Sequence, residues 1–264
     1  MKHLAIGPGV MGYFALIGVL KNMADTGQLE NLEEISGSSA GALTAFMYIT
    51  ARGNFERILD VSLNIPIAKL AKPDLKTLIK SYGLVPAERV KAIFSDTLKK
   101  LIPKKTDMTF EELYHYFPIK LHIATFCLDL SKTVYFSVDT HPKMSVLDAL
   151  YASVAVPFLF ESFVYKDWRY IDGAFMESTP CAPFLNKEDV LAVHLIYKNL
   201  NEYSDLRGYF SMILSAILKN RFFYTNVRHL HIDIGDSPVF NFNLTNEDKI
   251  KMYTLGYELA TQAS

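Results

Sequence analysis

The sequence predicts an α/β fold with a parallel sheet, and two repeated patterns near its start carry that prediction. An apolar run at residues 3–6 ends at the turn Gly7-Pro8-Gly9, and apolar residues at helical spacing follow over residues 12–24. A second short strand is expected at Ile35-Ser36, directly before Gly37, and residues 40–50 are apolar almost throughout. A strand, a glycine turn and a helix that recur in this order are typical of parallel sheets covered by helices.

The middle of the chain predicts further helices and strands. Residues 55–103 have helical character that Pro66, Pro73 and Pro86 interrupt, and residues 109–112 (Thr-Phe-Glu-Glu) predict a capping box at the start of a short helix. The remaining elements alternate between strand-like and helix-like patterns. We expect strands over 119–129 and 133–138, a helix over 145–155, a hairpin of 163–165 with 168–171, a strand over 190–197, a helix over 206–223, a strand over 227–234 and a helix over 246–263.

Composition excludes several classes of protein. Half of the 264 residues are apolar and 21% are charged, which excludes a disordered chain and a polytopic membrane protein. The 27 basic and 28 acidic residues give a net charge of −1, so we expect no nucleic-acid partner. With no long apolar segment and no secretory signal, we expect a soluble cytoplasmic protein that touches membranes at most transiently. Cys127 and Cys181 are expected to be buried free thiols.

The segment Gly37-Ser38-Ser39-Ala40-Gly41 matches the pattern G-x-S-x-G. Small residues around the central serine allow a sharp strand-to-helix turn, which lifts the hydroxyl of Ser39 out of the sheet as a nucleophile. The alternative is a structural role, in which Ser38 or Ser39 caps the following helix. Both uses are compatible if Ser36 or Ser38 makes the cap.

The first glycine turn, Gly7 to Gly12, matches G-x-G-x-x-G between a strand and a helix. One interpretation is a dinucleotide site with Glu30 or Glu33 as the ribose-binding acid. Against it, Pro8 removes one N–H from the phosphate cradle. The other interpretation is a bed of backbone amides for an oxyanion, with Gly9 and Val10 as the donors.

A nucleophilic serine needs a base, and the sequence offers two. Asp172 ends an apolar strand, and Gly173 directly after it allows a turn that projects the carboxylate beyond the sheet. The alternative is a histidine triad, because His229, His231 and Asp233 alternate along one predicted strand.

These motifs together resemble the patatin-like phospholipase family. That family has a glycine-rich motif near the start, G-x-S-x-G about 30 residues later, and D-G-G or D-G-A well over 100 residues after that. The stretch at residues 152–160, Ala-Ser-Val-Ala-Val-Pro-Phe-Leu-Phe, also resembles the A-S-x-A-x-P-x-x-F of the family. The resemblance covers residues 3–185, and we expect residues 186–264 to complete the same domain.

The resemblance implies a three-layer α/β/α fold with a mostly parallel central sheet. It implies that Ser39 is the nucleophile and Asp172 its general base, a dyad without histidine. The activity implied is hydrolysis of acyl esters of phospholipids or related lipids through an acyl-enzyme, without metal or other cofactor. The supporting residues implied are Gly7, Gly9, Val10 and Gly12 around the oxyanion hole, Gly37, Ser38, Ala40 and Gly41 around the nucleophile, and Gly173 and Ala174 after the acid.

Two positions depart from the family. Pro8 stands where many members have glycine, and Met11 stands where many have arginine or lysine. Loss of a charge-assisted hydrogen bond at that point would slow turnover. A lipid-binding member with weak or no catalysis is therefore the second hypothesis.

Two segments are candidates for contact with lipid. Residues 207–224 carry an apolar stripe and end in aromatic residues, which is compatible with a lid or an interfacial helix and also with a helix that packs into the core. Lys99, Lys100, Lys104 and Lys105 are candidates for headgroup attraction or a solvated helix end.

Overall fold

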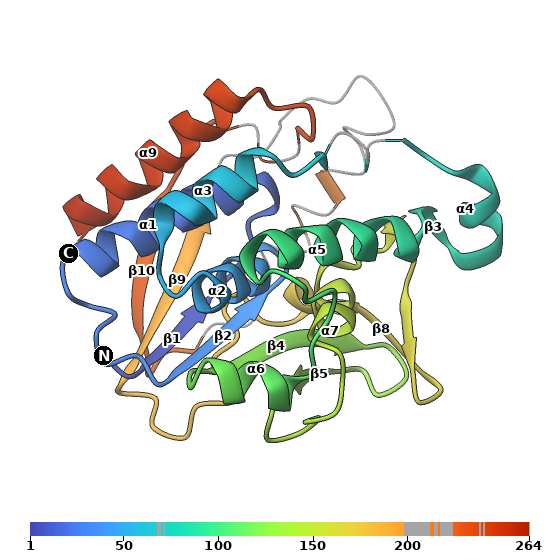
Figure 1. Cartoon of the computed structure of the whole chain (residues 1–264), viewed down its shortest axis with the longest axis horizontal. Coiled ribbons are helices and arrows are strands. Elements are labelled where there is room, and N and C mark those ends of the chain that lie inside the picture. The colour runs from blue at the N-terminus through green and yellow to red at the C-terminus, as the bar shows by residue number, and fades with distance from the viewer. Residues whose placement is uncertain are drawn as a thin grey trace.

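The computed structural model describes residues 1–67, 70, 72–197, 212–213, 216, 224–237, 239 and 241–263. It is a mixed α/β fold around a central, mostly parallel sheet (Figure 1), so the predicted fold class is confirmed.

Five parallel strands form the centre of the sheet. They lie side by side in the order β10 (Arg228–Asp233), β9 (Val190–Ile196), β1 (His3–Ile6), β2 (Glu34–Ser38) and β4 (Lys120–Cys127). The sheet is completed by antiparallel strands, which are β5 (Lys132–Phe136) and β8 (Trp168–Asp172) on β4, and β7 (Phe163–Tyr165) on β8.

The main core lies between the sheet and its helices. Alternate strand residues point to opposite faces, so Leu4 and Ile6 join the large core while Ala5 joins a smaller cluster with Cys181 and Phe184. Figure 1 shows α1, α2, α3 and α9 together on one side of the sheet. The helices are α1 (Tyr13–Asp25), α2 (Ala40–Thr50), α3 (Phe55–Leu63), α4 (Leu75–Ser81), α5 (Ala87–Leu101), α6 (Phe110–Tyr116), α7 (Val146–Val154) and α9 (Asn246–Ala263).

Most predicted elements are confirmed to within a few residues. The capping box is present in both directions, because Thr109 accepts from the Glu112 N–H and Glu112 accepts from the Thr109 N–H. Both cysteines are buried free thiols, and burial raises the pKa of Cys181 to about 11. The helix predicted over 206–223 falls almost wholly outside the described residues.

The prediction that residues 55–103 are helical is wrong in the middle of this stretch. It contains α3, α4 and α5, with a short strand β3 (Gly83–Val85) between α4 and α5. This strand pairs in parallel with β6 (Phe158–Phe160), which the sequence also did not predict. Strands of three residues carry little periodicity of their own, and β3 and β6, unlike the hairpin strand β7, are stabilised by a partner distant in sequence.

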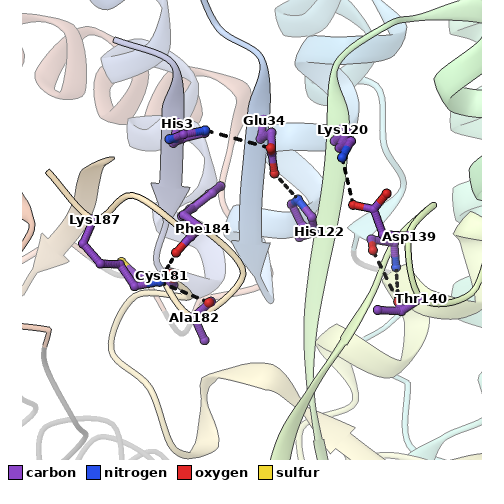
Figure 2. A network of polar contacts seen from close by, with 11 residues as sticks. His3, Glu34, Lys120, His122, Asp139, Thr140, Cys181, Ala182, Phe184 and Lys187 are labelled. Carbon is purple, nitrogen blue, oxygen red and sulfur yellow. Dashed lines mark hydrogen bonds and ion pairs between the residues drawn. The ribbon is translucent and has the colours of Figure 1, made fainter. Parts of the chain in front are cut away.

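At the amino-terminal ends of the central strands, Glu34 lies between two histidines (Figure 2). The buried His122 donates from Nε2 to Glu34 Oε2 over 2.8 Å, and His3 Nε2 lies 3.9 Å from Glu34 Oε1. Burial lowers the pKa of His122, and Glu34 partly offsets this effect. Folding therefore shifts the proton equilibrium of His122 toward the neutral imidazole.

Candidate active site

Strands β2 and β8 meet end to end along one edge of β4. Ala124 of β4 pairs with Ser38, the last residue of β2, and the next residue, Thr125, pairs with Asp172, the last residue of β8. Strand β5 pairs with both Ala124 and Thr125, so it occupies the opposite edge of β4. Ser38 and Asp172 must therefore share the remaining edge. This arrangement brings together two segments that are 133 residues apart in sequence.

Ser39 occupies the turn between β2 and α2. Its backbone has φ 52° and ψ −123°, a strained conformation for a residue with a side chain. Its Oγ donates to Asp172 Oδ2 over 2.7 Å, and the two residues are only 8% and 5% exposed. The strained turn and the short hydrogen bond have the geometry of an activated serine.

The carboxylate of Asp172 is held from its own turn. Oδ1 accepts from the Ala174 N–H over 2.8 Å, which leaves Oδ2 for Ser39, and the Asp172 N–H donates to the Ala155 carbonyl over 3.0 Å. A Cβ on Gly173 would lie 2.0 Å from the Ala124 carbonyl oxygen, so only glycine fits there. The D-G-A motif thus fits both the hydrogen bonding of the carboxylate and the close approach to β4.

Ser153, near the end of α7, is a site residue to which sequence reasoning gave no role. Its Oγ accepts from the Ser39 N–H over 2.9 Å and donates to the Ala124 carbonyl over 2.7 Å. It is fully buried. The only signal in the sequence was its place in the A-S-x-A-x-P stretch, which does not show what the hydroxyl contacts.

The first glycine turn lies beside Ser39. Ile6 of β1 pairs with Gly37 of β2, so the turns that follow these strands are neighbours. A Cβ on Gly41 would lie 2.3 Å from the Ile6 carbonyl oxygen and 2.5 Å from that of Gly7, so the start of α2 packs directly on the end of β1. The G-x-S-x-G glycine therefore brings the two turns together.

The amides of this turn have different partners. The Gly7 N–H donates to Val193 and the Gly12 N–H donates to Gly9, so neither points freely into the site. Among the described residues, the N–H groups of Gly9 and Val10 have no recorded acceptor. Of the four residues expected around an oxyanion hole, Gly9 and Val10 are the ones whose amides are available. Val10 also has a positive φ of 49°, a strained conformation for a β-branched residue.

The alternative roles for these motifs find little support in the geometry. Ser39 is at the N-cap of α2 but makes no side-chain capping hydrogen bond, and within the described chain the hydroxyls of Ser36 and Ser38 have no hydrogen-bond partner. His231 lies on β10, which is separated from β2 by β9 and β1. Three strand spacings amount to about 14 Å, beyond the reach of its side chain to Ser39.

Two neighbouring positions complete the surroundings. Met11, at the position where the family often has a cation, is buried in the main core at 4% exposure. Glu177 is a second buried carboxyl, five residues after Asp172, and accepts from the Tyr135 hydroxyl over 2.7 Å. Burial raises the pKa of Glu177 above its ordinary value.

Within the described ranges, no cluster of three or more histidine, cysteine, aspartate or glutamate side chains has a geometry that could hold a metal ion. In the same part of the chain, no helix combines the length and the apolar character needed to cross a membrane.

Comparison with known proteins identifies the chain's relatives. A protein of Acanthamoeba polyphaga mimivirus is 24% identical over 99% of this chain and 93% of its own length. A probable lipid hydrolase of Invertebrate iridescent virus 6 is 23% identical over 98% of this chain and 88% of its own length. The crystal structure of VipD from Legionella pneumophila superposes with a TM-score of 0.64 at 17% identity, covering 99% of this chain and 66% of VipD.

The family model described as patatin-like phospholipase matches residues 4–185, which include both glycine turns, Ser39, Ser153 and Asp172. The match extends over more than half of the chain, and VipD shares its fold. This chain therefore belongs to the patatin-like phospholipase family.

Proposed function

We propose that this protein is a serine acylhydrolase that cleaves acyl esters of phospholipids or related lipids. Membership of the patatin-like phospholipase family and the relative described as a probable lipid hydrolase support lipid hydrolysis in general. The observation that carries the specific mechanism is the hydrogen bond from Ser39 Oγ to Asp172 Oδ2 inside a buried, strained turn.

In the first step, Ser39 Oγ attacks the carbonyl carbon of the lipid ester while Asp172 takes the hydroxyl proton. The tetrahedral intermediate then collapses, and the bond between the acyl carbon and the alcohol oxygen breaks. Asp172 returns the proton to that oxygen, which releases the deacylated lipid and leaves the acyl group on Ser39.

In the second step, water takes the place of the alcohol. Asp172 removes a proton from water, the resulting hydroxide attacks the acyl carbon, and a free fatty acid leaves as the bond to Ser39 breaks. Ser39 Oγ recovers its proton from Asp172. The same carboxylate therefore serves as base and acid in both halves, and no histidine takes part.

Negative charge develops on the former carbonyl oxygen in each tetrahedral state. The amides of Gly9 and Val10, next to the start of α2, are the proposed donors to that oxygen. Removal of a comparable donor costs other acyl-transfer enzymes about 3–4 kcal/mol of transition-state stabilisation. Pro8 takes no part in this step, because proline has no N–H to donate.

A second candidate is a member of the family that binds lipid with little turnover. The buried Met11 favours it, because no cation extends from that position toward the oxyanion. Its site would be the same, but hydrolysis would be slow or absent.

The experiment that separates these candidates is turnover of a phospholipid panel, with released fatty acid and lysolipid measured by mass spectrometry. For the hydrolase we expect both products from the native protein and none from Ser39→Ala, which leaves the same fold but no nucleophile. Product from Ser39→Ala at the native rate would disprove the assignment of Ser39. Lipid binding without product from either protein would favour the second candidate.

A further inference from the structure

Exposed apolar side chains gather at one end of the molecule. Helix α4 has no buried residue, and Figure 1 shows it standing out from the body of the molecule, at the end opposite α9. Leu75 and Ile79 of α4 are 67% and 82% exposed, and Tyr82 directly after it is 65% exposed. Phe158 of β6, which pairs with the neighbouring Gly83, is 62% exposed. We call these four side chains the α4–β6 surface.

The same helix carries an excess of positive charge. Lys76 and Lys80 are exposed and lie one turn apart, next to the row formed by Leu75 and Ile79. Lys72 precedes the helix and is also exposed, and the one acidic residue among 72–82 is Asp74, whose carboxylate caps the start of α4 by accepting from the Lys76 and Thr77 N–H groups. Across the residues that the structure describes, no ion pair is recorded for these lysines. An apolar row beside a basic row is typical of a helix that lies in a membrane interface.

The α4–β6 surface is connected to the candidate active site by short, hydrogen-bonded links. Phe158 follows Ala155 by three residues, a span of at most about 11 Å. The Ala155 carbonyl is the group that accepts from the Asp172 N–H. Directly after the paired strands, the Ala87 N–H at the start of α5 donates to Glu161 Oε2 over 3.1 Å, which ties the segment after β3 to the segment after β6. A lipid layer that contacts this surface would therefore lie close to the dyad.

Two other exposed groups that carry lysine lack this combination. At the carboxyl-terminal end of α5, Lys99 pairs with Asp96, and the last residue of the helix, Leu101, is only 3% exposed. On α9, Ile250 is 44% exposed but lies among charges of both signs, with Lys251 paired to Glu247. Neither site offers apolar side chains and unopposed cations together.

We propose that the α4–β6 surface docks the protein on a lipid bilayer that contains anionic lipid, with the lysines at the headgroups and the apolar side chains below them. This inference rests on the proposed function, in which the substrate is a lipid, but binding to the bilayer does not itself require turnover. Each apolar side chain that enters the interface should strengthen binding about tenfold. Each lysine should add about fivefold at low salt.

The test is sedimentation with vesicles of phosphatidylcholine alone and of phosphatidylcholine with an equal amount of phosphatidylserine. All proteins carry Ser39→Ala, so that hydrolysis does not alter the vesicles. We expect binding to the mixed vesicles to fall about 100-fold in Leu75→Gln/Ile79→Gln and about 25-fold in Lys76→Gln/Lys80→Gln. Glutamine keeps helix propensity, so the substitutions leave α4 intact.

Matched controls change the same residue types elsewhere. Ile250→Gln on α9 and Lys99→Gln/Lys100→Gln on α5 should bind within twofold of the parent. Equal loss of binding in these controls, or parental binding by the α4 variants, would overturn the proposal. So would a dimer of the parent protein that the α4 substitutions dissociate, because the surface would then be covered by a second copy of the chain.

Hydrolysis of a water-soluble short-chain ester, measured without Ser39→Ala, separates this proposal from the proposed function. The α4 variants should hydrolyse the soluble ester at the native rate but act more slowly on the mixed vesicles. If the native protein hydrolyses neither substrate, the proposed function fails while the vesicle-binding result stands on its own.

Discussion

Removal of the Ser153 hydroxyl is the sharpest test of how Ser39, the proposed nucleophile, is held. Ser153→Ala leaves the Ser39 N–H and the Ala124 carbonyl without the partner that now joins them. Each of these two buried groups, left unsatisfied, costs about 1–3 kcal/mol, so the free energy of unfolding should fall by about 2–6 kcal/mol. The Ser39 backbone would also lose the hydrogen bond to Ser153 that helps to fix the position of the Ser39 hydroxyl. Because catalysis depends on sub-ångström placement, we expect hydrolysis to slow at least about tenfold.

Ser62→Ala is the matched control for this change. Ser62 is equally buried, and its Oγ also makes two hydrogen bonds, with the Tyr13 hydroxyl and the Ile58 carbonyl, but it lies on α3 away from Ser39. Thermal unfolding should show a loss of stability in both variants, and ester hydrolysis well below both melting temperatures should slow in Ser153→Ala alone. Native hydrolysis by Ser153→Ala under those conditions would show that Ser153 has only a structural role.

Two further predictions concern the surrounding fold. Gly173→Ala should lower the free energy of unfolding by at least about 2 kcal/mol, because its Cβ would meet the Ala124 carbonyl. In the control Gly235→Ala, the added Cβ has open space around it, so the only cost is the backbone strain of alanine at a positive φ. Equal melting temperatures of the two variants would contradict this prediction. Burial lowers the pKa of His122, so the unfolded chain binds the proton more readily, and stability should fall as the pH drops through the ordinary histidine pKa of about 6.5. His122→Gln should make that fall shallower in chemical denaturation, and an unchanged slope would exclude His122 as its source.

The fold was largely predictable because its elements are signalled locally. The two strand–turn–helix units at the start of the chain need only apolar periodicity and glycine, and α2 has the predicted bounds of residues 40–50. By contrast, β3 and β6 are stabilised by pairing with each other across more than 70 residues. No local pattern carries that information.

In the candidate site, too, local patterns predicted the residues but not the contacts between segments distant in sequence. The residue types of Ser39 and Asp172 could be selected from their motifs, but their hydrogen bond depends on β2 and β8 sharing one edge of β4. The roles of the glycine-turn amides could not be separated in the sequence. Those of Gly7 and Gly12 are used within the fold, and Gly9 and Val10 remain as the donors we propose. The link through Ser153 joins three distant segments and was not predictable at all.

The central claim is that Asp172 activates Ser39, and covalent labelling by a fluorophosphonate tests it most directly. Mass spectrometry of the native protein should locate the adduct on Ser39. Asp172→Asn keeps the size of the side chain and an oxygen for the Ala174 N–H, but it removes the base, so labelling should slow about 100- to 10,000-fold in a folded protein. An adduct on another residue, or labelling of Asp172→Asn at the native rate, would contradict the claim.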